Sequence, residues 1–178
     1  MARVTFVALM LLSSVVQASI SDATTDRLLT KDTLQQAEHE ALRIENQFVR
    51  ENVLHDVAVA EAKAGYQKNA LKTASLIRGE DDKDFALIDV AAAEAESHHV
   101  LGALKTASTI KDPSHRSAAM EAIALRQLET GDQAGALHTV DLITDQRMRD
   151  DAFLHIVTAE VHSSNVKNAL QTAKHIEV

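Results

Sequence analysis

Hydrophobic and small residues recur along this chain with a strict period of 33 residues. An Ala-Leu pair at Ala70 and Leu71 returns at 103–104, 136–137 and 169–170 without an insertion or deletion. The threonines in the same register are Thr73, Thr106, Thr139 and Thr172, and the isoleucines are Ile77, Ile110, Ile143 and Ile176. Because a fixed period of this length is typical of proteins that stack similar units, the pattern predicts an array with an extended binding surface.

Each period contains two segments whose apolar residues have helical spacing. The first segment of the first repeat carries Leu54, Val57 and Ala58. The second segment carries a stripe made of Ala70, Thr73, Ala74 and Ile77. No segment alternates as a strand does, so the predicted fold class is all-α, an α-solenoid of antiparallel helix hairpins. We expect first helices at 47–64, 80–97, 113–130 and 146–163, with a shorter second helix after each.

The expected helix ends carry residues that suit them. Three good N-caps precede first helices, namely Asn46, Asp112 and Asp145. Pro113 suits a first helical position, where its missing N–H costs nothing. Gly65 and Gly131 are expected to end first helices, and Asp132 or Asn165 to open second helices.

The two ends of the array differ. Residues 32–45 match the second half of a repeat, which predicts an N-terminal capping half repeat opened by a capping box of Asp32 and Gln35. Residues 46–178 would hold four hairpin repeats, and 19–31 a flexible leader. At the far end an apolar edge is expected either to drive self-association into a homo-oligomer or to be covered by polar neighbours. This edge consists of Leu170, Ala173 and Ile176.

The first residues read as a cleavable signal peptide over 1–18, cut after Ala18. Arg3 gives a positive start, 4–16 is mostly apolar, and Val16 and Ala18 are small residues at the cleavage positions. The apolar run is shorter than the roughly 20 residues that a membrane-spanning helix needs. The sequence therefore predicts a periplasmic or secreted protein with no integral membrane segment after cleavage.

Charge and composition exclude several partners. After Ala18 the chain keeps 17 basic and 26 acidic residues, a net charge of 17 − 26 = −9. Nucleic acid is not expected as a partner, because its phosphates need basic clusters. Tryptophan and cysteine are absent and Tyr66 is the single tyrosine, so stacking platforms, disulfides and thiolate metal sites are not expected.

The repeat resembles the tetratricopeptide-repeat family over residues 46–178. The residues that carry the resemblance in the first repeat are Leu54, Val57, Ala58, Gly65, Ala70, Ala74 and Ile77. The resemblance implies a right-handed superhelix of about four repeats plus the half repeat. The chain departs from the family in its shorter period, in the missing proline at the end of most units, and in its polar residues at the aromatic position. These polar residues are Glu61, Glu94, Gln127 and Glu160. A helical-hairpin array of HEAT-like lineage is the alternative.

The resemblance also implies that a partner lies along the inner face of the first helices, in an apolar concave groove. Transferred position by position, this face presents His55, Val59, Lys63, Phe85, Ile88, Glu96, Glu121, Leu125, Leu128, Leu154, Val161 and His162. Aliphatic residues would form the floor and charged residues the rim. The alternative is that Val59, Ile88, Leu125 and Leu154 pack against neighbouring helices.

The remaining polar residues give no catalytic motif. His98 and His99 are adjacent, and His155 and His162 are two helical turns apart, so no histidine pair has metal-binding spacing. We expect the recurrent threonine hydroxyls to bond the backbone carbonyl one turn back. The recurrent pair Arg50 and Glu51 and its equivalents are interpreted as charge pairs, and the acids of the first helix as products of duplication. We expect no enzyme activity and no cofactor.

The sequence therefore predicts an exported scaffold, adaptor, chaperone or accessory subunit that binds another protein or peptide, helical or extended. Two alternatives remain open. One is a carrier of a small apolar ligand in the groove, and the other is a structural array that assembles with itself.

Overall fold

The computed structural model describes residues 30–176, and these form nine α-helices, one short 3-10 helix and no strand. The all-α class is confirmed for this part of the chain. The helices are α3 (Lys31–Leu42), α4 (Gln47–Lys63), α5 (Gln67–Ser75), α6 (Glu80–Glu96), α7 (Val100–Ser108), α8 (Pro113–Glu129), α9 (Gln133–Asp141), α10 (Gln146–His162), α11 (Val166–Thr172) and the 3-10 helix η2 (Ala173–His175).

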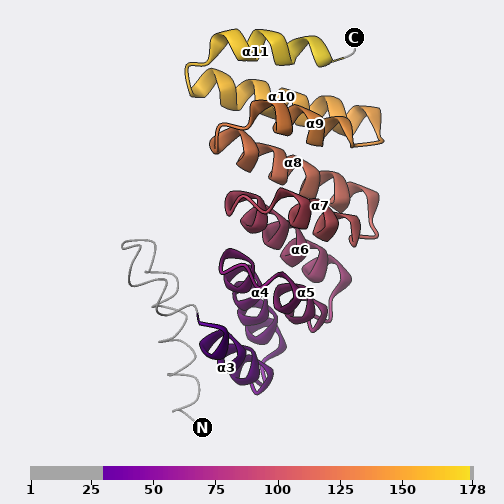
Figure 1. The fold of residues 1–178 in the computed structure, drawn as a ribbon. Coiled ribbons are helices and arrows are strands. Elements are labelled where there is room, and N and C mark those ends of the chain that lie inside the picture. The colour runs from indigo at the N-terminus through magenta and orange to yellow at the C-terminus, as the bar shows by residue number, and fades with distance from the viewer. Residues whose placement is uncertain (1–29, 177–178) are drawn as a thin grey trace.

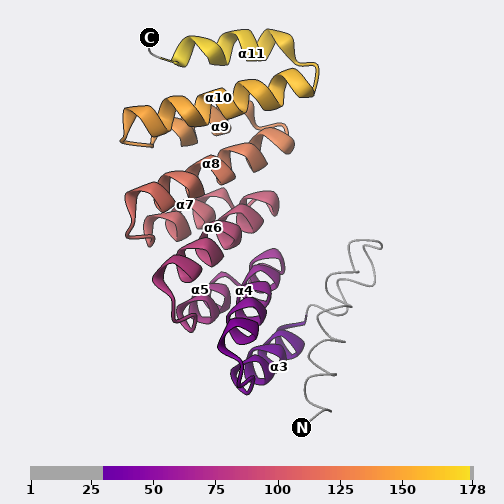
Figure 2. The same ribbon diagram turned by 180° about the vertical axis from the view of Figure 1, so that it is seen from behind.

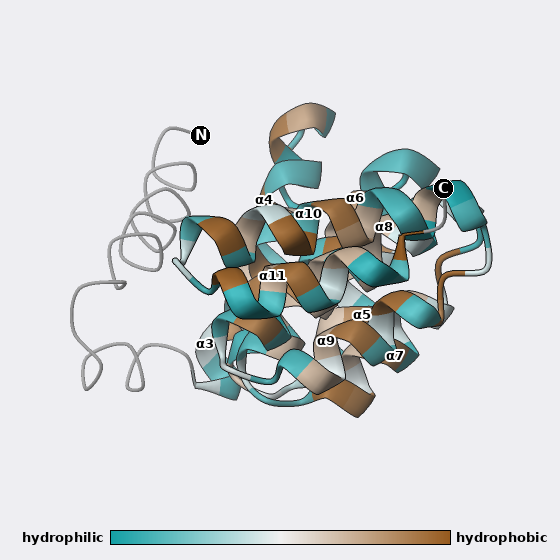
Figure 3. Ribbon diagram, turned by 90° about the horizontal axis from the view of Figure 1, so that it is seen from above, coloured by the Kyte–Doolittle hydropathy of each residue, from teal (hydrophilic) through white to brown (hydrophobic). Residues whose placement is uncertain are grey.

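The helices stack one above another, from α3 at one end to α11 at the other (Figure 1). Helices α4, α6, α8 and α10 form one row, in which each contacts the next. Each of α5, α7 and α9 packs against the long helix before it and the long helix after it. The long helices face the viewer in Figure 2, and the view down the stack shows the two layers (Figure 3).

Small residues make this close stacking possible, because alanines line most of the contacts between helices. One core cluster runs from α3 to α8 and includes Leu54 and Ile123. A second cluster runs from α8 to α10 and includes Phe153 and Ile156. The two clusters divide between Ile123 and Ala124, which are neighbours on α8.

The expected starts of the long helices are confirmed by their caps. The side chains of Asn46 and Asp145 accept hydrogen bonds from the backbone N–H groups of Val49 (3.1 Å) and Met148 (2.9 Å). Asp112 caps α8 in the same way, and Pro113 is its first residue. The long helices begin at the expected residues and end one residue earlier than expected.

The N-terminal cap of α3 differs from the expectation. The Thr30 hydroxyl accepts from the Thr33 backbone N–H at 3.3 Å, so α3 begins at Lys31. The Thr33 hydroxyl donates to the Thr30 carbonyl at 2.8 Å and reinforces this turn. The expected capping box of Asp32 and Gln35 is therefore wrong by two residues. The predicted signal peptide and residues 19–29 of the leader lie outside the described part.

Every long helix ends in the same turn. In the first repeat the Tyr66 N–H bonds the Glu61 carbonyl, and the Gly65 N–H bonds the Ala62 carbonyl. These two bonds define a Schellman motif, which places one residue in the left-handed region. The residues in that position are Gly65 (φ 78°), His98 (φ 62°), Gly131 (φ 86°) and Ser164 (φ 62°). Glycine thus occupies the position in two repeats, and a residue with a side chain occupies it in the other two.

Replacing His98 or Ser164 with glycine is expected to stabilise the protein by about 1 kcal/mol each, because a Cβ is disfavoured in the left-handed region. Gly131→Ala supplies the matched control, since a Cβ at this glycine would have no atom within 4 Å and would test backbone strain alone. It should shift the thermal midpoint down, while His98→Gly and Ser164→Gly shift it up. Equal midpoints for all three variants would contradict the prediction.

A threonine in each of the first three short helices donates a hydrogen bond to a buried side chain of the long helix before it. The bonds are Thr73 to Glu61 (2.7 Å), Thr106 to Glu94 (2.8 Å) and Thr139 to Gln127 (2.6 Å). The expectation that these hydroxyls bond their own helix is wrong for these three residues. The acids face the short helices because they lie on the buried side of α4 and α6.

The fourth repeat departs from this arrangement. Thr172 Oγ1 and Glu160 Oε2 are buried and have no hydrogen-bond partner among the described residues. The chain passes from α11 into the 3-10 helix at Ala173, directly after this threonine. The other oxygen of Glu160 accepts from the Gln133 amide at 2.8 Å.

Three arginines at the start of long helices bond backbone carbonyls, in place of the simple charge pairs expected. The bonds are Arg50 to Ile44 (3.0 Å), Arg116 to Ile110 (3.1 Å) and Arg149 to Ile143 (2.9 Å). Each carbonyl belongs to the isoleucine after the preceding short helix. The guanidinium groups therefore satisfy helix-end carbonyls, and Arg50 also pairs with Glu51 at 3.4 Å.

Candidate binding groove

A hollow of about 460 Å³ lies between the N-terminal halves of α4 and α6. We call it the Phe48–Phe85 groove. Its lining residues are Gln47, Phe48, Glu51, Asn52, His55, Ile77, Asp82 and Phe85. Phe48, Asn52 and His55 lie on one face of α4, because they are spaced by about one helical turn.

Two phenylalanines are the most exposed apolar groups of the groove. The Phe48 side chain is 75% exposed and the Phe85 side chain 52% exposed. The Phe85 ring stacks at a tilt on the His115 imidazole of α8, with 5.1 Å between the ring centroids. Exposed aromatic rings on adjacent helices are suited to contact an apolar group of a partner.

His55 joins α4 to α6 at the end of the groove. Its Nε2 lies 2.8 Å from Asp89 Oδ2. This hydrogen bond raises the pKa of His55, while its partial burial opposes the rise. A histidine–carboxylate bond also joins the next two long-helix pairs, between Asp84 and His115 (3.1 Å) and between Glu121 and His155 (2.6 Å).

The floor and rim of the groove carry negative charge. Glu51 is buried and accepts a hydrogen bond from the Arg78 backbone N–H at 3.1 Å. Asp82 lies in the first turn of α6 beside Glu80 and Asp81. Lys83 pairs with Glu80 at 2.8 Å and lowers the pKa of this acid. The groove therefore combines apolar rings with acidic groups.

The structure does not gather all the residues predicted for the concave face into one hollow. His55 and Phe85 line the groove, whereas Lys63 and Glu96 form an ion pair of 3.6 Å further along α4 and α6. Glu121 is engaged by His155. Four predicted floor residues pack partly buried against the cores, namely Val59, Ile88, Leu125 and Leu128. Three more are exposed on α10, namely Leu154, Val161 and His162.

The predicted C-terminal edge is mixed. The Leu170 side chain is 66% exposed, and Ala173 is exposed as well. Ile176 instead packs against the second core cluster. Self-association through this edge stays a prediction.

Phe48 is a groove residue that the sequence interpretation missed. It lies in the first turn of α4, outside the stretch that the family resemblance maps onto the binding face. An apolar aromatic residue at a polar helix start, away from the buried stripe, was the available signal.

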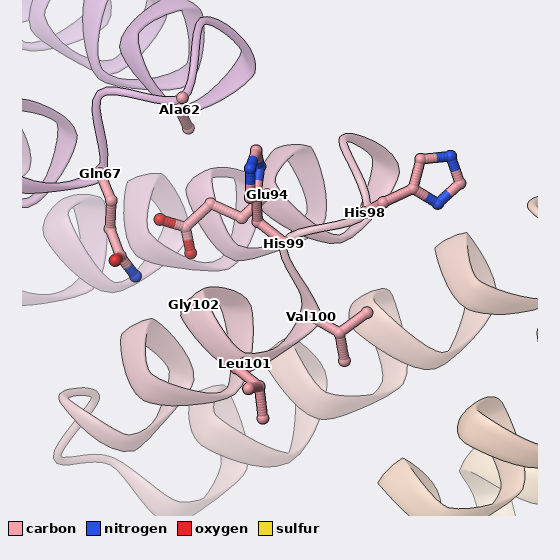
Figure 4. A pocket seen from close by; sticks show the side chains of 9 residues that line it. Ala62, Gln67, Glu94, His98, His99, Val100, Leu101 and Gly102 are labelled. Carbon is pink, nitrogen blue, oxygen red and sulfur yellow. The ribbon is translucent and has the colours of Figure 1, made fainter.

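A second hollow, of about 380 Å³, lies where α6 turns into α7. Figure 4 shows the Glu94 carboxylate and the Gln67 amide on the side of α7, with His98 pointing away from both. Burial raises the pKa of Glu94, and the Thr106 hydroxyl, the Gln67 amide and the His99 charge oppose this rise.

Metal binding and membrane insertion receive no support from residues 30–176. In this range no three histidine or acidic side chains are placed to hold a metal ion. No helix in the same range has the length and apolar character needed to cross a membrane.

No protein-family model, curated protein or solved structure matches the chain. The class of protein therefore rests on the fold itself, which is an all-helical stack of alternating long and short helices.

Proposed function

We propose that this chain is an exported α-solenoid of TPR-like hairpins that binds a segment of another protein in the Phe48–Phe85 groove. The observation that carries the proposal is the presence of two exposed phenylalanines, on consecutive long helices, in one hollow. Grooves between stacked helices suit peptide segments that insert apolar anchors.

The charges around the groove indicate the character of the bound segment. Glu51 and Asp82 line the hollow, and the first turn of α6 adds two further acids. A basic residue beside an apolar or aromatic anchor would complement this surface. Such charges chiefly set the orientation and the association rate of the partner.

Phe48→Asp and Phe85→Asp are each expected to weaken partner binding at least tenfold, since loss of an aromatic anchor commonly costs about 2 kcal/mol. Leu101→Asp is the matched control, because this leucine is 86% exposed and lies outside the groove. A photo-crosslinking residue placed at 85, and separately at 101, in the protein's own cells would identify the partner.

A protein crosslinked from position 85 and not from 101, and lost in Phe48→Asp, would support the proposal. Equal crosslinking from both positions would overturn it. Recovery of a small apolar molecule or of a second copy of the chain at position 85 would favour the carrier or the self-assembling array.

A further inference from the structure

The second hollow has the features of a small polar site that is separate from the Phe48–Phe85 groove. It is lined by the C-terminal end of α6, the turn through His98 and His99, and the first residues of α7. Gln67 and Ala62 contribute from the preceding hairpin (Figure 4). The test of this site therefore does not depend on the proposed peptide groove.

Helix α7 begins at this hollow without a side-chain cap. Its N-cap residue is His99, which makes no capping hydrogen bond. The first N–H groups of a helix have no partner within the helix. Those of Val100, Leu101 and Gly102 therefore supply donors on the hollow's lower wall.

Two further polar atoms at the hollow have no hydrogen-bond partner. Glu94 is 2% exposed, and its Oε1 is unpartnered although Thr106 bonds its Oε2. The Gln67 Nε2 is buried and unpartnered as well. The amide lies near enough to influence Glu94, but no hydrogen bond of normal geometry joins them. Unpaired buried groups of this kind are costly unless something binds them.

The third repeat shows how the same place is filled by the chain itself. Asp132 is the equivalent of His99, and its Oδ1 accepts from the Gly135 N–H at 2.9 Å. Its Oδ2 accepts from the Gln127 amide at 3.1 Å. Gln127 and Gly135 are the equivalents of Glu94 and Gly102, each 33 residues later. A carboxylate thus joins the helix N-terminus to the buried side chain.

In the second repeat the buried side chain has the opposite character at this point. The Gln127 amide nitrogen is a donor, whereas the unpartnered Glu94 Oε1 is an acceptor. A group that fits here must accept from the start of α7 and donate to Glu94. A primary carboxamide has the shape of the Asp132 carboxylate, with an NH2 group in place of one oxygen.

We infer that this hollow binds a primary carboxamide, whose oxygen accepts from the Gly102 N–H and Gln67 Nε2 and whose NH2 group donates to Glu94 Oε1. The absence of a side chain at position 102 keeps the approach open. A Cβ there would lie 2.9 Å from Gln67 Nε2 and push the amide out of place. The carboxamide belongs either to an asparagine or glutamine side chain of a partner or to a free small molecule.

The test is an NMR titration of the 15N-labelled chain with acetamide, and separately with acetate and with N,N-dimethylacetamide. Acetamide should give saturable shifts at the Leu101 and Gly102 N–H groups, with a dissociation constant in the millimolar range. Acetate lacks the donor and dimethylacetamide lacks N–H groups, so both should shift these resonances at least tenfold less.

The double variant Glu94→Gln with His99→Asp copies the third repeat into the second and should abolish the acetamide shifts, because the chain's own carboxylate then fills the place. Gln67→Leu is a second variant, which removes one donor without altering α6 or α7 and should weaken binding severalfold. Titration with L-glutamine and with a glutamine-containing peptide distinguishes the two sources by which one binds more tightly.

Three results would overturn the inference. The first is an absence of saturable shifts with acetamide, as expected if Gln67 and Glu94 close on one another. The second is an equal response to acetate. The third is an acetamide response that persists unchanged in both the double variant and Gln67→Leu.

Discussion

Phe153→Ala is expected to destabilise the protein by about 3–5 kcal/mol, the largest effect of any substitution considered, because it empties the centre of the second core cluster. Phe153 is 1% exposed and is the largest fully buried side chain of the described residues. Its ring also lies 5.0 Å, between centroids, from that of His175. Alanines around it cannot extend to fill the space.

Phe85→Ala is the matched control, since it removes the same side chain from a half-exposed place in the groove. It should cost less than about 1 kcal/mol. Urea unfolding gives both values, and hydrogen exchange should show the loss concentrated in α10 and α11 for Phe153→Ala. Similar costs for the two variants, or exchange raised evenly from α4 to α11, would contradict the described division into two clusters.

Glu94→Gln is expected to stabilise the protein by about 1 kcal/mol at neutral pH, because an ionised acid pays more for burial than a neutral amide. The native third repeat already carries glutamine at the equivalent place, where Gln127 accepts from Thr139. Thr106 should donate to the new amide oxygen in the same way. Glu61→Gln should act similarly, because burial also raises the pKa of Glu61.

The gain should depend on pH in a defined direction. Burial raises the pKa of Glu94 in the folded state above its unfolded value of about 4.3. The folded chain then binds the proton more tightly than the unfolded chain, so stability falls as the pH rises from the unfolded pKa through the folded one. Below pH 4 both states are protonated and most of the advantage of glutamine should vanish.

Thermal unfolding between pH 4 and pH 8 measures this difference. Glu96→Gln is the control, because Glu96 is exposed near the end of the same helix. Its effect should be small at every pH. A gain for Glu94→Gln that is absent at pH 7, or that is the same at pH 4, would show that the buried acid is not costly when ionised.

The period of the sequence predicted the helices well because it reports local properties. Asn46 and Asp145 cap the helices they precede, and Pro113 begins α8, since capping depends on residues within one turn. The left-handed turns at Gly65 and Gly131 were also expected, because glycine favours that conformation. Tertiary contacts played little part in these predictions.

The polar contacts between helices could not be predicted in the same way. The hydroxyl of Thr106 has acceptors available on its own helix and on α6, and only the packing of the two helices selects Glu94. The arginines that bond isoleucine carbonyls required the angle between consecutive hairpins. The groove was found only in part, because the family resemblance placed His55 and Phe85 there but not Phe48.

The turn after each long helix carries a record of how the array was assembled. Glycine at 65 and 131 alternates with His98 and Ser164, so the chemistry of this corner recurs every 66 residues. Gln67 and Gln133, which approach Glu94 and Glu160, follow the same doubled spacing. The unit that was copied is thus a pair of hairpins with two unlike halves. Shortening the protein by a pair would preserve the order of its corners, whereas removing a single hairpin would join two halves of the same kind.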